Sequence, residues 1–189
     1  MPNSEIKNFM PQRGNYRNLI AFQKSECIYD VTVLFTRKYL SFGDRTIDQM
    51  VQAARSGKQN IAEGCAASTT SRETEIKLLN VAKASFQELL LDYEDYLRIN
   101  NLSQWGTSNT RLAKLRALCS ANNNSAFYRE IFEKCTDEMV ANLAITLIHQ
   151  NDVFLRKLID RAKADFLQTG GIREQMTRGR IEYRKSHNK

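Results

Sequence analysis

Apolar residues recur every three or four positions along most of this chain, which is the spacing of helices that bury one face. The first such stretch begins near Asn15 and predicts a helix of about 24 residues. Six apolar residues define its buried face: Leu19, Phe22, Ile28, Val31, Leu34 and Phe35. The pattern ends at Ser41-Phe42-Gly43, so the chain is expected to turn there.

A second helix is predicted from Asp44 to Gly64. Asp44 suits the capping position, because a carboxylate accepts hydrogen bonds from the free amides of a first helical turn. The apolar stripe of this helix is broken and contains Ile47, Met50, Val51, Ala54, Ile61 and Ala62. Gly64 is expected to end the helix in the left-handed conformation, which glycine adopts without steric cost.

A third helix is predicted from Ser71 to about Ile99. Ser71 suits the cap, and Glu73 and Glu75 fall in the first turn, where negative charge stabilises a helix. The apolar face consists of Ile76, Leu79, Ala82, Phe86, Leu89, Leu90, Tyr93, Tyr96 and Leu97. Residues 100–106 break the pattern, residues 110–119 predict a short basic helix, and residues 121–125 predict a turn.

The last long helix is predicted from about Phe127 to Leu167, with room for a bend at residues 135–137. One apolar seam runs along it: Phe132, Met139, Leu143, Leu147, Phe154, Leu158, Ala162 and Phe166. Thr169-Gly170-Gly171 ends regular structure. Residues 172–183 then form either a frayed basic helix or a segment that folds only on a partner.

These elements predict an all-α protein, an up-down-up-down four-helix bundle over residues 15–167 with a short helical insertion at about 102–125. Residues 1–14 contain both prolines and no sustained apolar period, so they are expected to form a flexible leader. Residues 168–189 form a basic C-terminal extension. Only 2 prolines and 8 glycines occur in 189 residues, which favours long helices over a sheet sandwich.

Composition narrows the class of protein further. No apolar run approaches the roughly 18 residues that cross a bilayer, and the first residues lack the apolar core of a secretory signal. The four cysteines stand singly, without the pairing of zinc sites or the density of disulfide scaffolds: Cys27, Cys65, Cys119 and Cys135. We expect a cytoplasmic protein with reduced thiols and no membrane association.

The formal net charge is +7, and it is unevenly distributed. Six Lys or Arg against two Glu give the segment 168–189 a net charge of +4. Excess positive charge favours polyanionic partners through counterion release, so nucleic acid is a candidate partner. The alternative is a solvated tail that keeps the protein in solution.

Basic residues are therefore the candidate binding residues. Those around the first two helices and the following turn are Arg37, Lys38, Arg45, Arg55, Lys58 and Arg72. Those in the extension are Arg173, Arg178, Arg180, Arg184 and Lys185. A bundle could gather the first group on one end or face, where charge and reach suit phosphates; alternatively they pair with Asp44, Asp48 and Glu63. Four aromatic residues could stack on bases or pack internally: Tyr16, Tyr29, Tyr39 and Trp105.

Signals of catalysis are scarce. The only histidines are His149 and His187, and no phosphate-binding glycine loop occurs. Asp92, Glu94 and Asp95 form the densest acidic cluster, which could hold a metal, but the Glu-x-x-His pattern of di-iron bundles is missing because Thr146 precedes His149 by three residues. We expect this cluster to be solvated or paired with basic residues of another subunit. No catalytic residue, metal ligand or cofactor is predicted.

The run from Arg55 through Asn60-Ile61-Ala62-Glu63-Gly64 resembles the signature of a bacterial four-helix-bundle family, first noticed as proteins encoded in intervening sequences of large-subunit ribosomal RNA genes. The chain looks like the branch with an added C-terminal segment, and the likeness covers about residues 15–97. It implies a ring-like homopentamer. A relative in diversity-generating retroelements binds a reverse transcriptase and nucleic acid through a basic surface. Asn60, Glu63 and Gly64 are expected to be architectural.

Three functional hypotheses follow. The first is a non-enzymatic oligomeric bundle that binds nucleic acid or a nucleoprotein partner through its basic surface, with little sequence specificity. The second is a protein-interaction scaffold whose C-terminal extension docks on another protein. The third is an enzyme, which would need a bound metal or cofactor.

Overall fold

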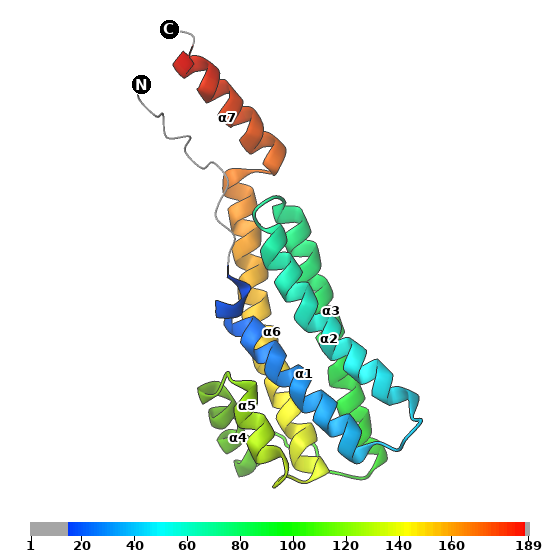
Figure 1. Cartoon of the computed structure of the whole chain (residues 1–189). Helices are drawn as coiled ribbons and strands as arrows, with labels where there is room; N and C mark the ends of the chain where they lie inside the picture. Colours follow the sequence, from blue (N-terminus) through cyan, green and yellow to red (C-terminus); the bar gives the residue numbers. More distant parts are fainter. Residues whose placement is uncertain (1–14, 188–189) are drawn as a thin grey trace.

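The structure is a computed structural model that describes residues 15–187, and every regular element in this range is helical (Figure 1). The described chain is all-α, as the hydrophobic pattern predicts. The leader predicted at residues 1–14 lies outside the described residues. After a 3-10 turn (Tyr16–Asn18), the helices are α1 (Ile20–Tyr39), α2 (Arg45–Ala67), α3 (Arg72–Ile99), α4 (Thr110–Ala121), α5 (Ser125–Phe132), α6 (Asp137–Thr169) and α7 (Ile172–His187).

Local capping starts α2 and α3 where the sequence predicts. The Asp44 carboxylate accepts a hydrogen bond from the main-chain nitrogen of Thr46 at 2.9 Å. The Ser71 hydroxyl oxygen accepts one from the main-chain nitrogen of Thr74 at 3.2 Å. Both bonds satisfy amides that a first helical turn leaves free, so both predicted caps are confirmed.

The predicted left-handed stop at Gly64 is wrong. Gly64 is buried within α2 and does not have a positive φ, and the helix continues to Ala67. The hydroxyls of Ser68, Thr69 and Thr70 each donate to the carbonyl oxygen three residues earlier. These bonds satisfy carbonyls that the last helical turn leaves free, so the helix ends without a glycine.

Gly64 and Gly57 instead lie where α2 approaches α3 closely. A Cβ atom at Gly57 would lie 2.5 Å from the ring of Phe86. A Cβ atom at Gly64 would lie 3.5 Å from the nearest atoms of Leu78 and Leu79, which is ordinary contact. The two glycines are seven residues apart and therefore share one face of the helix. Their lack of side chains brings the α2 backbone close to α3.

The predicted long helix over residues 127–167 is broken rather than bent. α5 ends at Phe132, and α6 begins only at Asp137. The Thr136 hydroxyl oxygen accepts a hydrogen bond from the main-chain nitrogen of Met139 at 3.3 Å and so caps a new helix. The Tyr39 hydroxyl of α1 donates to the carbonyl of Cys135 at 2.8 Å and holds the link in place.

One continuous core lies between the long helices. α1 packs against α2 and α6, and α3 packs against the same two helices (Figure 1). The fully buried aromatic rings of Phe35 and Tyr93 meet there at 5.0 Å between centroids. The Tyr93 hydroxyl donates to the Thr32 hydroxyl at 3.0 Å, so its polar end is satisfied inside the core.

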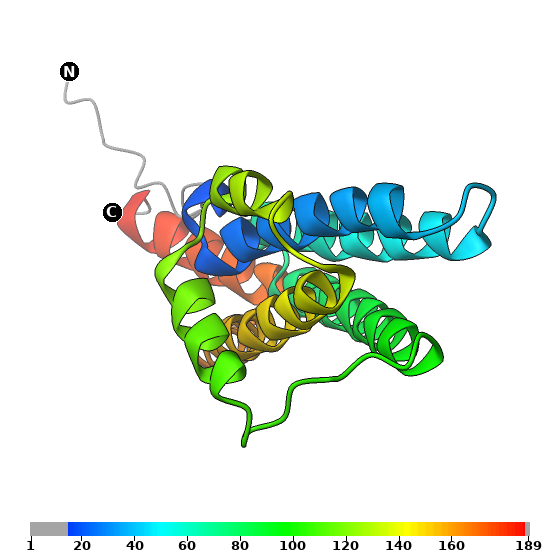
Figure 2. The same cartoon turned by 90° about the horizontal axis from the view of Figure 1, so that it is seen from below.

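The segment predicted as an insertion, residues 102–125, forms α4, whereas α5 comes from the predicted start of the last long helix. α4 packs on α6 and α5 packs on α1, on the side away from α3 (Figure 2). Lys24 of α1 is only 1 % exposed. Its ammonium donates to the main-chain carbonyls of Cys119 and Asn122 at the end of α4. A cation at a helix C-terminus satisfies free carbonyls and the helix dipole, so Lys24 fixes the insertion to the core.

α7 leaves the core at Gly170, whose φ is +72°. This helix extends to His187, past the frayed end predicted near residue 183. α7 points away from the other helices, and no other described helix packs extensively against it (Figure 1). Within residues 15–187, no helix combines the length and apolar character that spanning a bilayer requires.

Candidate functional site

The candidate basic residues outside α7 do not gather on one surface. Arg37 and Lys38 end α1 and Arg45 begins α2, so these three adjoin the α1–α2 link. Arg55 and Lys58 lie near the middle of α2. Arg72 begins α3, at the opposite end of α2 from that link (Figure 1).

Two of these cations are engaged by carboxylates. The Arg72 guanidinium lies 2.8 Å from a Glu75 oxygen and 3.5 Å from an Asp165 oxygen, so it joins α3 to α6. Lys38 lies 3.2 Å from a Glu133 oxygen, and this hydrogen bond raises the pKa of Lys38. The sequence suggested Asp44, Asp48 and Glu63 as the ion-pair partners of these cations. These three carboxylates take part in none of the ion pairs observed in residues 15–187.

The aromatic candidates are held by internal contacts. Trp105 is 8 % exposed, and its indole nitrogen donates to a Glu138 oxygen at 2.9 Å. For Trp105 the packing alternative therefore holds, because its ring faces are not available to bases. The Tyr29 ring is covered by the Lys58 ammonium at 4.2 Å from the centroid.

The signature residues lie on α2. The Asn60 side-chain nitrogen donates to the carbonyl oxygen of Ser56 at 2.9 Å, four residues earlier on the same helix. Gly64 lies against α3, as described above. The Glu63 side chain is exposed and takes part in none of the side-chain hydrogen bonds or ion pairs observed within residues 15–187.

α7 is the one place where several candidate cations line up. Arg173, Arg180 and Arg184 are seven and four residues apart, so they form one row along the helix. All three are exposed, and α7 carries five Lys or Arg against two Glu, a net charge of +3. Met176 and Tyr183 lie beside this row and are 47 % and 64 % exposed. α7 is thus a basic amphipathic helix outside the core.

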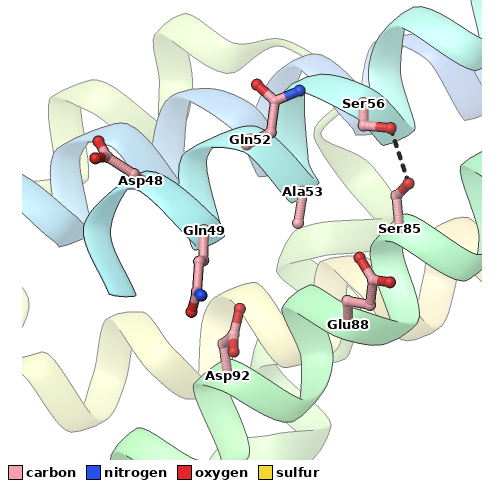
Figure 3. A pocket seen from close by; sticks show the side chains of 8 residues that line it. All are labelled: Asp48, Gln49, Gln52, Ala53, Ser56, Ser85, Glu88 and Asp92. Atoms are coloured by element: carbon pink, nitrogen blue, oxygen red, sulfur yellow. Dashed lines mark hydrogen bonds between the residues drawn. The ribbon is translucent and has the colours of Figure 1, made fainter. Parts of the chain in front are cut away.

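One hollow of the described chain is acidic. It lies between α2 and α3, has a volume of about 660 Å³, and is called here the acidic groove (Figure 3). Its lining residues are Asp48, Gln49, Gln52, Ala53, Ser56, Ser85, Glu88 and Asp92. Gln49 and Asp92 point toward each other across it, and the Ser56 and Ser85 hydroxyls are hydrogen-bonded at 2.9 Å (Figure 3).

The charged side chains that line the acidic groove are all negative. Its lining contains three carboxylates and no basic side chain. Burial, with the nearby charges of Asp95 and Glu88, raises the pKa of Asp92 above its ordinary value. The sequence marks Asp92 and Asp95 as a cluster but gives no sign of Asp48, because only the packing of α2 on α3 brings that residue to the site.

The remaining reactive groups show no catalytic arrangement in the described chain. None of the four cysteines forms a disulfide within residues 15–187, and burial raises the pKa of the Cys27 thiol to about 12 and of the Cys119 thiol to about 11. Such thiols are poor nucleophiles near neutral pH. In the part of the chain that the structure describes, no His, Cys, Asp or Glu side chains form a group of three suited to a metal ion.

Comparison of the chain with protein-family models, with curated proteins and with solved structures finds no match.

Proposed function

We propose that this chain is a non-enzymatic helical protein that binds nucleic acid or a nucleoprotein through α7, with little sequence specificity. The observation that carries the proposal is the exposed row Arg173, Arg180 and Arg184 on a helix outside the core. At 1.5 Å per residue this row spans about 16 Å, enough to contact several phosphates of one strand. Contacts of this kind depend on charge and reach, so they do not select a base sequence.

Outside α7, only some of the candidate cations are available to contact phosphates. Arg37, Arg45 and Arg55 are exposed and remain candidate phosphate contacts. Arg72 and Lys38 contribute less, because carboxylates already neutralise them. An exposed ion pair is weak, so Lys38 can exchange its partner more easily than the doubly paired Arg72.

A salt titration tests the proposal. Fluorescence anisotropy would follow labelled single- and double-stranded RNA and DNA at rising salt, with the full chain and with Arg173→Gln/Arg180→Gln/Arg184→Gln. If all three arginines contact phosphates, the slope of log K against log salt falls by about 2.7 for duplex DNA. The matched control is Lys157→Gln/Arg161→Gln/Lys163→Gln on α6, which removes the same charge from exposed positions. No binding at low salt, or equal effects of both triples, would contradict the proposal.

A second candidate function is docking of α7 on another protein. It is favoured by Met176 and Tyr183, which expose apolar surface beside the arginine row. Deleting residues 168–189 separates the two functions. If α7 docks on a protein, the deletion should abolish one protein contact and leave nucleic-acid binding intact. If α7 binds nucleic acid, the deletion should reduce the salt dependence of nucleic-acid binding.

We further infer that α1, α2, α3 and α6 constitute an up-down-up-down four-helix bundle, with α4 and α5 as its insertion. The cyclic packing of these four helices supports this architecture. Together with the Arg55–Gly64 run, it is consistent with the intervening-sequence-encoded family and with a homopentamer. Light scattering of the purified protein tests the pentamer, because a mass other than five subunits contradicts it.

A further inference from the structure

We infer that α7 of one molecule docks in the acidic groove of a second copy of this chain. The inference goes beyond the proposed function, although it uses the same helix. Its basis is that one chain carries both a basic amphipathic helix outside the core and a hollow lined by carboxylates.

The acidic groove lacks a counter-charge of its own. Asp48, Glu88 and Asp92 take part in none of the ion pairs observed in residues 15–187. The raised pKa of Asp92 shows that this carboxylate is ionised at a cost in its present surroundings. Cations placed in the groove would lower that cost, and a helix that carries several would do so along the whole groove.

α7 has the complementary features. Its net charge of +3 matches the three carboxylates of the groove. Arg180 and Arg184 are four residues apart on α7, and Glu88 and Asp92 are four residues apart on α3, so the spacing of the two charge pairs is the same, about 6 Å. Met176 can cover Ala53, the one apolar residue of the lining, whose small side chain allows close approach.

The groove of the same chain is out of reach. The Arg72–Asp165 ion pair places the start of α3 beside residue 165 of α6, which continues to Thr169, about 6 Å farther from the groove. α7 is about 24 Å long, and Glu88 lies about 24 Å along α3 from Arg72. The link from Thr169 to Ile172 adds at most about 11 Å, so Arg180 and Arg184 of a folded-back α7 would lie at least about 7 Å short of Glu88 and Asp92 along α3. A second copy has no such restriction.

Reversing the charges on each side gives the test. Full-length Arg180→Glu/Arg184→Glu reverses α7, and full-length Glu88→Lys/Asp92→Lys reverses the groove. Sedimentation velocity should show each variant alone associating at least about tenfold more weakly than the unmodified chain. An equimolar mixture of the two should regain association, because each reversed helix then meets a reversed groove. The control Lys157→Glu/Lys163→Glu, on exposed positions of α6, should associate like the unmodified chain.

The inference is overturned if the unmodified chain is monomeric at high protein concentration, if neither variant weakens association, or if the mixture does not regain it. Circular dichroism checks that both variants keep their helix content. If the α7 variant loses helix content, the milder Arg180→Gln/Arg184→Gln is used in its place. A failure of the proposed function can be told apart from a failure of this inference by measuring nucleic-acid binding as well. The groove variant should still bind nucleic acid, whereas the α7 variant should lose both nucleic-acid binding and self-association. If both variants lose self-association but keep nucleic-acid binding, the result would support this inference and contradict the proposed function.

Discussion

Asn151 is an unusual residue for a helical core. It is fully buried in α6, and neither its side-chain oxygen nor its nitrogen has a hydrogen-bond partner among the described residues. A buried amide without a partner costs about 1–3 kcal/mol. Leucine has the same number of non-hydrogen side-chain atoms as asparagine and no polar group. We therefore expect Asn151→Leu to raise the free energy of unfolding by about 1–3 kcal/mol, measured by urea denaturation.

Asn142 provides the matched control on the same helix. Its side chain accepts from the Trp105 main-chain nitrogen at 2.7 Å and donates to the carbonyls of Ser103 and Glu138 at 2.9 and 2.8 Å. Asn142→Leu should lower the free energy of unfolding by about 1–3 kcal/mol, because it leaves the buried Trp105 N–H without an acceptor. If both substitutions change stability in the same direction, the bonding of these two amides does not explain their roles.

Polar residues also show which contacts a sequence can predict. The caps at Asp44 and Ser71 were predictable because each bonds to a residue two or three positions away. The role of Lys24 was not, because its acceptor Cys119 is 95 residues away. Nothing in the local pattern distinguishes a lysine that caps a distant helix from one that faces water.

At the scale of elements, the two glycines of α2 give opposite predictions for the same substitution. Gly57→Ala would place a methyl group 2.5 Å from the Phe86 ring and force α2 and α3 apart. Overpacking of this kind costs about 1–3 kcal/mol, more than the gain of about 1 kcal/mol in helix propensity. We expect Gly57→Ala to lower the midpoint of thermal unfolding.

Gly64→Ala serves as the control. Its methyl group would make only ordinary contacts at 3.5 Å, so the propensity gain of up to about 1 kcal/mol should remain. We expect this variant to unfold at the same or a higher temperature, measured by circular dichroism at 222 nm. A loss of stability as large as that of Gly57→Ala would mean that α2 and α3 do not approach each other as described.

The elements that were predicted wrongly share one cause. Gly64 stands where a helix could stop, but its effect depends on its distance from α3. The break before α6 was hidden because apolar residues continue on both sides of residues 135–137. Hydrophobic periodicity reports which side of a helix is buried, whereas helix ends depend on caps and partners.

At the scale of the whole molecule, the sequence predicted the amount of charge but not its placement. The +4 of the C-terminal segment was evident from composition, and α7 presents much of it outside the core. The candidate cations outside α7 are spread from the α1–α2 link, through the middle of α2, to the start of α3 (Figure 1). The acidic groove could not be predicted, because Asp48 and Asp92 meet only through the packing of α2 on α3.

Cysteine and tyrosine side chains in and beside the core make the free energy of unfolding depend on pH in the alkaline range. Burial raises the pKa of Cys27 to about 12, of Cys119 to about 11 and, with a hydrogen bond to Asp137, of Tyr96 to about 12. The folded protein therefore keeps protons that the unfolded chain releases above about pH 9 for thiols and pH 10 for tyrosine. Because the unfolded state then binds fewer protons, the free energy of unfolding falls as pH rises through this range. Lys24, whose pKa is lowered by burial, acts in the opposite direction.

We expect each of the two thiols to lower stability by about 1 kcal/mol between pH 9.5 and 10.5, measured by urea denaturation with a reducing agent present. Cys27→Ala and Cys119→Ala remove one titrating group each, so both variants should lose less stability over this interval than the unmodified chain, even if they are less stable at pH 8. Cys65→Ala is the control, because the Cys65 thiol is only half-buried and its removal should change the pH dependence less. Equal pH dependence in all four proteins would show that the buried thiols ionise as readily in the folded core as in water.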